Sequence, residues 1–124
     1  MNLGITGSKG EDFAVKYLRR KKYRIIARNY QTRFGEIDII CTYGQFIAFV
    51  EVKTRSVNYM VSGKEAVTHQ KQKKIIKAAM EFLQRNDFDL QPRFDVIEVI
   101  SDGGKMSADH IENAFDTEGV NGFF

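Results

Sequence analysis

Hydrophobic and polar residues alternate with a period of two from Gly35 to Arg55, which predicts a β-hairpin. The reversal falls at Gly44, because glycine accepts the positive φ of a tight turn without steric cost. Alternate side chains of a strand share a face. One face of the predicted hairpin is therefore apolar throughout, and its residues are Ile37, Ile39, Cys41, Phe46, Ala48, Val50 and Val52.

The opposite face of the hairpin ends in charged residues. A turn centred between residues 44 and 45 places Asp38 opposite Glu51, and Glu36 opposite Lys53. Two opposed carboxylates destabilise a sheet, so we expect a compensating charge, and a divalent cation is the simplest candidate. Lys53 could then stabilise charge on a phosphate or position a water. An isolated Glu-x-Lys is usually structural, and a register slip of one residue would move Asp38 to the other face.

A helix is predicted before the hairpin. Ser8 and Glu11 have the spacing of a capping box, which places the helix at about residues 8–22 after a loose segment at 1–7. The basic residues at 19–22 suit the negative end of a helix dipole at least as well as they suit a nucleic acid. Glu11 is either a cap residue or a carboxylate that completes a metal site beside the hairpin.

A second helix is predicted after the hairpin, from an N-cap at Thr68 to about Arg85. Lys71 and Lys74 lie in its first half, where the helix dipole disfavours cations, so helix stability does not account for them. His69 is expected at the surface. The loop at 56–66 leaves the charged end of the hairpin and is expected to border a substrate.

Further strands are predicted at residues 23–32 and 93–100, with an additional edge strand at 110–115. The order is then α-β-β-β-α-β with an extra C-terminal strand, which gives an α+β fold with a mixed sheet flanked by helices. At 124 residues the chain is long enough for one domain, which we place at 1–116, with 117–124 as a flexible tail.

Composition indicates the cellular compartment in which the protein is expected. Cys41 is the single cysteine, so no intrachain disulfide is expected, and a buried small hydrophobe is the simplest interpretation. No apolar run approaches the ~20 residues that span a bilayer, and the N-terminus lacks the apolar region of a signal peptide. We therefore expect a cytoplasmic protein that does not bind a membrane.

The net charge is only +3, but it is unevenly distributed. Residues 9–33 carry a balance of +7 and residues 64–85 a balance of +4, whereas residues 86–124 carry −7. The basic segments could form one phosphate-binding surface or two solvated helix faces. The acidic C-terminal third also leaves open a protein-interaction domain that binds a basic partner.

Several blocks together resemble the YraN family of uncharacterised bacterial proteins. That family is similar to archaeal Holliday-junction resolvases of the PD-(D/E)xK, or restriction-endonuclease-like, fold. The resemblance covers roughly residues 7–115. Its most specific blocks are Gly35-Glu36-Ile37-Asp38 and Val50-Glu51-Val52-Lys53, supported by Gly7-x-x-Gly10-Glu11, Arg28-Asn29, Glu65-Ala66-Val67, Lys71 and Arg93-Phe94-Asp95-Val96. Two departures are Lys22, where a glycine usually precedes the tyrosine, and Met60-Val61, where we expect a Phe-Gly pair.

The resemblance implies a metal-dependent endonuclease that hydrolyses DNA, including branched or structured DNA. Asp38 and Glu51 would bind Mg²⁺ or Mn²⁺, with the Val52 carbonyl as a further ligand. Lys53 would orient water or stabilise charge, and Glu11 would be an accessory acid.

The same resemblance implies basic residues that hold phosphates without reading sequence, namely Arg28, Arg55, Lys71 and Lys74. It also implies a homodimer, since a symmetric junction suits a two-fold protein. Arg93 and Asp95 are interpreted as structural. A nucleic-acid-binding module of the same fold that does not cut is the alternative function.

Overall fold

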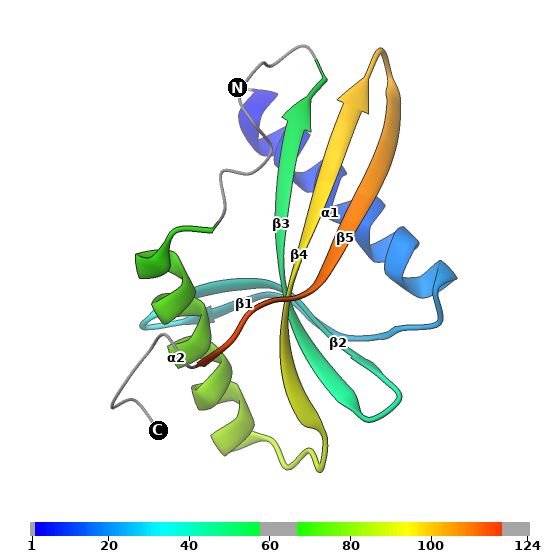
Figure 1. Ribbon diagram of the computed structural model, residues 1–124. Coiled ribbons are helices and arrows are strands. Elements are labelled where there is room, and N and C mark those ends of the chain that lie inside the picture. Colours follow the sequence, from blue (N-terminus) through cyan, green and yellow to red (C-terminus); the bar gives the residue numbers. More distant parts are fainter. Residues whose placement is uncertain (1, 58–66, 118–124) are drawn as a thin grey trace.

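The computed structural model describes residues 2–57 and 67–117, with side chains from residue 9 onward in the first helix. The elements follow the order expected from the sequence, with two helices and five strands (Figure 1). Their bounds are α1 (Asn2–Arg20), β1 (Arg24–Thr32), β2 (Gly35–Tyr43), β3 (Phe46–Ser56), α2 (His69–Arg85), β4 (Gln91–Asp102) and β5 (Lys105–Phe115). Most of the predicted 117–124 tail and most of the predicted 56–66 loop lie outside the described residues.

The sheet is mixed, as predicted. Its strands lie in the order β1-β2-β3-β4-β5, and only β3 and β4 are parallel. The hairpin register is the predicted one where the two strands pair, because Ile40 lies opposite Phe49 and Tyr43 opposite Phe46. The ladder ends at Ile39 and Val50, after which β3 continues beside β4 alone. The sheet therefore splits into two arms that point in different directions (Figure 1).

The predicted opposition of Glu36 and Lys53 is wrong, because it assumed that the hairpin ladder continues to its open end. Glu36 pairs with Gln31 of β1, and Lys53 pairs with Glu98 of β4. Beyond the ladder β2 remains paired with β1 and β3 remains paired with β4, so the two strands of the hairpin part with their outer neighbours, which the alternation pattern within the hairpin does not encode. Beyond the split, β2 twists with β1, and β3 twists with β4.

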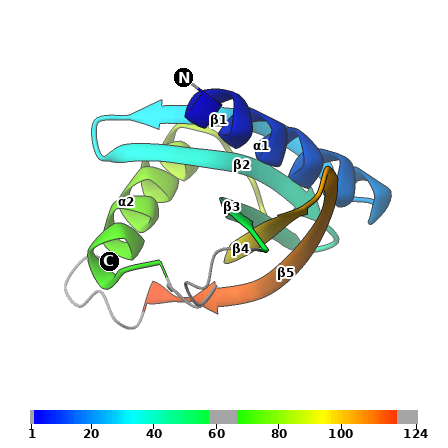
Figure 2. The ribbon, with the colours of Figure 1, turned by 90° about the horizontal axis from the view of Figure 1, so that it is seen from above.

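The helices cover opposite faces of the sheet (Figure 2). α1 packs on the predicted apolar face, where Cys41 is fully buried among Ala14, Leu18 and Val50. α2 packs on the other face, around Phe49 and Phe82. The prediction that Ile37 shares a face with Ile39 and Cys41 is wrong, because Ile37 packs in the α2 cluster and the other two pack under α1. Ile37 lies beyond the split, in the part of β2 that pairs with β1 but not with β3.

The predicted start of α1 is wrong, because the helix begins at Asn2 and Ser8 lies inside it. A serine three residues before a glutamate fits a helix interior as well as a cap, so the pattern could not exclude a longer helix. The tight contact between α1 and β3 is clear at Gly10, where a Cβ atom would collide with the side chain of Thr54. This close approach fixes the helix on the sheet.

α1 ends in a Schellman motif at the point where the sequence departs from the family pattern. The Tyr23 N–H donates to the Leu18 carbonyl at 2.9 Å, and the Lys22 N–H donates to the Arg19 carbonyl at 3.0 Å. Lys22 has φ of 74°, the left-handed conformation that glycine adopts without strain. The glycine expected from the resemblance would therefore suit the backbone better than the lysine.

We expect Lys22→Gly to raise the free energy of unfolding by about 0.5 to 1 kcal/mol, because it relieves a left-handed lysine at an exposed helix end. Urea denaturation followed by circular dichroism measures the change. Lys16→Gly, at an exposed position within α1, is the matched control and should lower stability by about 1 kcal/mol. A decrease in stability for Lys22→Gly would contradict this account.

The second half of the chain largely follows the sequence prediction. The Thr68 hydroxyl caps α2 by accepting from the Lys71 N–H at 3.1 Å, and His69 is exposed. β4 is buried over Arg93–Val99, as expected for a strand covered on both faces. β5 is the predicted edge strand but starts five residues earlier, directly after the Gly103-Gly104 turn. Neither helix in the described part of the chain has the length and apolarity to span a membrane.

Candidate functional site

The site begins where β2 and β3 separate. Asp38 is the first residue of β2 beyond the ladder with β3, and its Oδ2 accepts from the Val52 N–H at 2.8 Å. The Asp38 carboxylate thus takes the place of a neighbouring strand's carbonyl as the hydrogen-bond acceptor for the β3 backbone. Because the N–H and C=O of a residue in an extended strand point to the same side, the Val52 carbonyl also faces the gap. The separation of the strands thus exposes backbone and carboxylate oxygens together.

Asp38 and Glu51 line a groove of about 340 Å³ between the sheet and the N-terminal half of α2. We call it the carboxylate groove, and its lining residues are Gly35, Glu36, Asp38, Glu51, Thr68, Gln70, Lys71, Lys74 and Ile75. Glu51 is buried, with 6% of its surface exposed. The predicted pair of carboxylates is therefore brought to one site, together with two of the predicted phosphate-binding lysines.

Lys71 forms the shortest ion pair of the site. Its Nζ lies 2.6 Å from Glu51 Oε2, although half of the lysine side chain remains exposed. Burial alone would lower the pKa of Lys71, but the hydrogen bond to Glu51 and the negative charge of Asp38 raise the pKa above its usual value. Lys71 thus supplies a positive charge next to the carboxylates.

The pKa of the Asp38 carboxyl lies well above its ordinary value. Burial, followed by the negative charge of Glu51, raises the pKa of Asp38 to about 7, against an ordinary value of 3.8. The hydrogen bond from Val52 opposes the rise but does not cancel it. A pKa near neutrality marks a site that would gain from added positive charge.

Glu11 reaches the site through Asn29. In the orientation that satisfies both carboxylates, the Asn29 amide nitrogen donates to Glu11 Oε1 at 3.0 Å and to Glu36 Oε2 at 2.8 Å. Burial and then the charge of Glu36 raise the pKa of Glu11. Asn29 has φ of 50°, a left-handed conformation that asparagine tolerates better than most residues. From the sequence, Asn29 is a polar residue before the hairpin that could contact phosphate or face water, and no spacing signal identifies this bridge.

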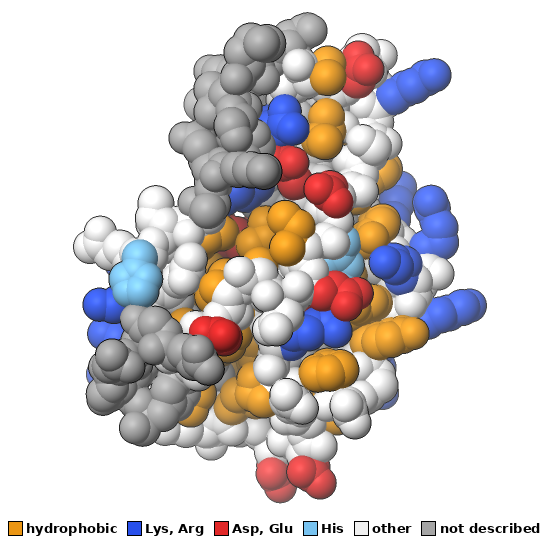
Figure 3. Space-filling model, viewed as in Figure 1, with side chains coloured by type: hydrophobic (Ala, Val, Ile, Leu, Met, Phe, Trp, Pro, Cys, Tyr) orange, Lys and Arg blue, Asp and Glu red, His pale blue; other side chains and the backbone are white. Residues whose placement is uncertain are grey.

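Arg28 and Arg55, both predicted to hold phosphates, are engaged in ion pairs within the protein. Arg28 lies 2.7 Å from Asp12 Oδ1, and Arg55 Nε lies 3.0 Å from Glu98 Oε2. Glu98 is 9% exposed and was not predicted as a site residue. Figure 3 shows acidic and basic side chains side by side over the C-terminal halves of β3 and β4.

Lys53 is not among the described residues that line the carboxylate groove. It lies two residues beyond Glu51 on β3, so the two side chains share a face and their Cα atoms are roughly 7 Å apart. Its neighbour on β4 is Glu98. Lys53 therefore lies next to the groove, further along the arm formed by β3 and β4.

Arg93 and Asp95 belong to a separate buried network. Arg93 forms two hydrogen bonds with Asp95, at 2.9 and 2.8 Å, and Asp95 Oδ2 also lies 2.8 Å from His110 Nε2. The Asn113 N–H donates to Asp95 Oδ1 at 3.0 Å. The network joins β4 to β5 and lies outside the carboxylate groove, which agrees with the structural interpretation of Arg93 and Asp95.

The donor set of the carboxylate groove fits a small, hard cation. No group of three or more His, Cys, Asp or Glu side chains in the described part of the chain has an arrangement that could hold a metal. Mg²⁺ does not require one, because it is usually held by one or two carboxylates and completes its shell with water and phosphate oxygens. Asp38 and Glu51 line the groove and supply the two carboxylates, and Val52, which is not among the described lining residues, directly follows Glu51 on β3 with its carbonyl on the side of Asp38. Burial and then the charge of Glu51 raise the pKa of Asp38, and a bound cation would offset both by favouring the ionised carboxylate.

Fold and site together define an α+β protein with a split mixed sheet, whose split exposes paired carboxylates beside lysines of a helix. The chain belongs to the uncharacterised protein family UPF0102, whose model matches residues 10–99. The sequence blocks had predicted membership of an uncharacterised bacterial family, and the match confirms it.

Curated relatives named UPF0102 protein are similar to the chain over most of its length. A protein of Geobacter metallireducens is 46% identical over 111 residues, which covers 89% of this chain and 91% of the relative. One from Caldanaerobacter subterraneus is 44% identical over 120 residues, with 93% and 98% covered. One from Alkaliphilus oremlandii is 46% identical over 112 residues, with 88% and 96% covered.

Proposed function

We propose that the protein is a metal-dependent endonuclease that hydrolyses phosphodiester bonds of DNA. The observation that carries the proposal is the carboxylate pair, Asp38 and Glu51, in a groove that also presents Lys71 and Lys74. Carboxylates bind a divalent cation, and lysines bind phosphate, so the groove combines the two components that phosphodiester hydrolysis requires.

Asp38, Glu51 and the Val52 carbonyl would hold Mg²⁺ or Mn²⁺. When bound, the ion would polarise a phosphate oxygen and make a coordinated water more acidic. Lys71 and Lys74 would bind and orient the substrate phosphates. Lys53, on the same face of β3 as Glu51, would position the attacking water or stabilise negative charge on the phosphate.

Glu11 acts in this proposal through its neighbours. The Asn29 amide joins it to Glu36, and its negative charge also raises the pKa of Asp38. Glu11 would therefore favour a cation at Asp38, although it is not among the described residues that line the groove. Arg28 and Arg55 would have to leave their ion pairs with Asp12 and Glu98 to contact phosphate.

A non-catalytic nucleic-acid-binding module is the second candidate function. The ion pair between Lys71 and Glu51 favours it, because an ammonium group 2.6 Å from Glu51 already supplies positive charge to the carboxylates. A catalytic metal ion would have to displace this ammonium. The two candidates therefore differ in one measurable property, which is metal-dependent turnover.

Cleavage of end-labelled DNA tests the proposal. Four-way junction, flap, single-stranded and duplex substrates are incubated with Mg²⁺, Mn²⁺ or EDTA. We expect cutting only with metal, and loss of cutting in Lys53→Ala. Lys105→Ala, at the exposed start of β5, is the matched control and should cut like the unaltered protein. If no DNA is cut but DNA is bound, the non-catalytic module is correct, and equal cutting by Lys53→Ala would indicate a contaminating nuclease.

A further inference from the structure

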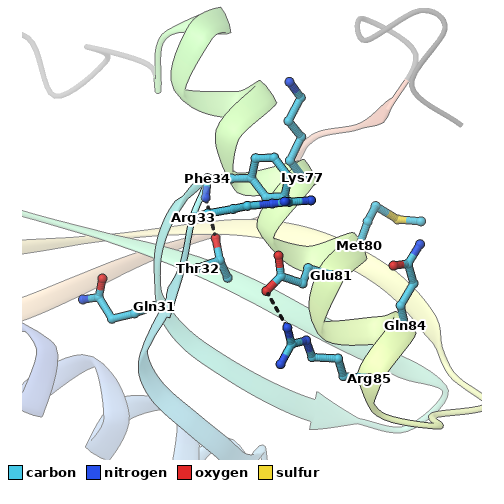
Figure 4. Close-up of a pocket in the computed structure, with 9 residues that line it drawn as sticks. All are labelled: Gln31, Thr32, Arg33, Phe34, Lys77, Met80, Glu81, Gln84 and Arg85. Carbon is cyan, nitrogen blue, oxygen red and sulfur yellow. Dashed lines mark hydrogen bonds and ion pairs between the residues drawn. The ribbon is translucent and has the colours of Figure 1, made fainter.

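A second and larger groove lies on α2 beyond the carboxylate groove, and the proposed function does not use it. Its volume is about 740 Å³, and the C-terminal half of α2 faces the β1–β2 turn across it (Figure 4). We call it the aromatic groove, and its lining residues are Gln31, Thr32, Arg33, Phe34, Lys77, Met80, Glu81, Gln84 and Arg85.

The aromatic groove contains an aromatic ring that lies close to two cations. The Arg33 guanidinium carbon lies 4.9 Å from the centre of the Phe34 ring, and Lys77 Nζ lies 5.8 Å from it. Figure 4 shows both cationic side chains next to the ring. An aromatic ring and a planar guanidinium both stack with nucleobases, and each base has a face that can take part. Phe34 and Arg33 therefore provide a stacking surface.

The charge of the groove also suits a nucleic acid. Among the described residues that line it, Arg33, Lys77 and Arg85 are the cations and Glu81 is the only acidic side chain. Glu81 lies 3.7 Å from Arg85, so its charge is partly compensated within the helix. The lining keeps an excess of positive charge that attracts the phosphate backbone.

The two grooves adjoin along α2. Lys71 and Lys74 line the carboxylate groove, and Lys77, three residues further on, lines the aromatic groove. This row rises about 9 Å along the helix axis from Lys71 to Lys77. On the opposite wall, Phe34 lines the aromatic groove, and the next residue, Gly35, lines the carboxylate groove. A nucleic-acid strand bound at the carboxylates can therefore continue directly onto the stacking surface.

We propose that the aromatic groove binds an unpaired DNA strand next to the cleavage site, with a base stacked on Phe34 and Arg33 and phosphates on the lysines of α2. This inference rests on the proposed function and names its substrate as DNA with a single-stranded segment. The reason for an unpaired strand is that base pairs in a duplex are stacked on each other and do not present a free face to Phe34. Duplex DNA would use the phosphate contacts alone.

Fluorescence anisotropy with a labelled oligo-dT and a labelled blunt duplex, both in EDTA, tests the inference. We expect Phe34→Leu to weaken binding of the oligo-dT about tenfold and to leave duplex binding within about twofold. Phe34→Tyr keeps the ring and should bind like the unaltered protein. Tyr43→Leu removes an exposed aromatic ring on β2, away from the groove, and is the matched control.

Thermal unfolding shows whether each variant is folded, and the Phe34→Tyr protein reports on the ring if Phe34→Leu is not. Oligo-dT binding that is equal in Phe34→Leu and Tyr43→Leu would overturn the inference, whether or not the unaltered protein cuts DNA. A selective loss in Phe34→Leu supports the groove even if the cleavage assay shows no cutting. The failure of the inference and that of the proposed function are thus separate results.

Discussion

Asp38→Asn should abolish metal-dependent cleavage and at the same time stabilise the protein. The loss of a charged metal ligand is expected to lower the cleavage rate by about a thousandfold or more, since a bound metal contributes several kcal/mol to the transition state. The gain in stability follows from the protonation behaviour of Asp38, whose pKa is raised to about 7 by burial and by Glu51. The neutral asparagine keeps an oxygen that can accept from the Val52 N–H.

The pH dependence of this gain has a definite sign. The folded protein binds a proton at Asp38 more tightly than the unfolded chain does, so ionisation of Asp38 costs stability as pH rises from about 4 to about 7. Asp38→Asn lacks this cost. Its advantage over the unaltered protein should therefore appear across that range and stay constant above it, at about 2 to 4 kcal/mol.

Urea denaturation in EDTA at pH 4 and pH 8 measures the difference. The matched control is Asp109→Asn, the same substitution at an exposed position of β5, which should change stability by no more than about 0.5 kcal/mol. If Asp38→Asn were less stable than the unaltered protein at pH 8, burial and the charge of Glu51 would not destabilise the ionised Asp38 carboxylate as this account requires.

The second large effect is expected from Asp95→Ala, which should lower the free energy of unfolding by about 3 to 5 kcal/mol. Asp95 is fully buried, and its carboxylate accepts from Arg93, His110 and the Asn113 N–H. Removing it leaves the guanidinium of Arg93, which is 8% exposed, without its closest counter-charge. Such a loss is a large share of the 5–15 kcal/mol that is typical of a domain.

Asp95→Asn is the milder variant and reports on charge alone, because the amide oxygen still accepts hydrogen bonds. Burial by itself would raise the pKa of Asp95, but the bonds from His110 and Arg93 outweigh it and hold the pKa below its usual value of 3.8. The stabilisation by Asp95 is therefore present above about pH 4 and is lost as pH falls further. The difference between Asp95→Asn and the unaltered protein should shrink below that pH. Equal stability of Asp95→Asn and Asp109→Asn at pH 8 would contradict the role of the network.

The local parts of the fold could be predicted from the sequence because single stretches encode them. The hairpin register follows from alternation around Gly44, and it placed Asp38 and Glu51 at the same site. The start of α2 follows from Thr68, whose hydroxyl caps the helix. The positive φ of Lys22 agrees with the glycine expected there.

The remaining features depend on contacts between distant segments, which no local pattern records. Past the split β2 follows β1 and β3 follows β4, so the relation of Glu36 to Lys53 could not be read from the hairpin. The Arg93–Asp95–His110 network joins β4 to β5, and no pattern within either strand indicates that these side chains meet. The Asn29 bridge requires a left-handed backbone whose position gives no spacing signal.

Calorimetric titration of Mn²⁺ at pH 8, with and without an oligonucleotide, tests the central claim that the carboxylate groove holds a divalent cation. The proteins compared are the unaltered chain, Asp38→Asn and the Asp109→Asn control. We predict binding of one ion, with affinity at least about tenfold weaker in Asp38→Asn and unchanged in Asp109→Asn. The absence of Mn²⁺ binding to the unaltered protein under both conditions, or equal affinity in Asp38→Asn, would contradict the claim.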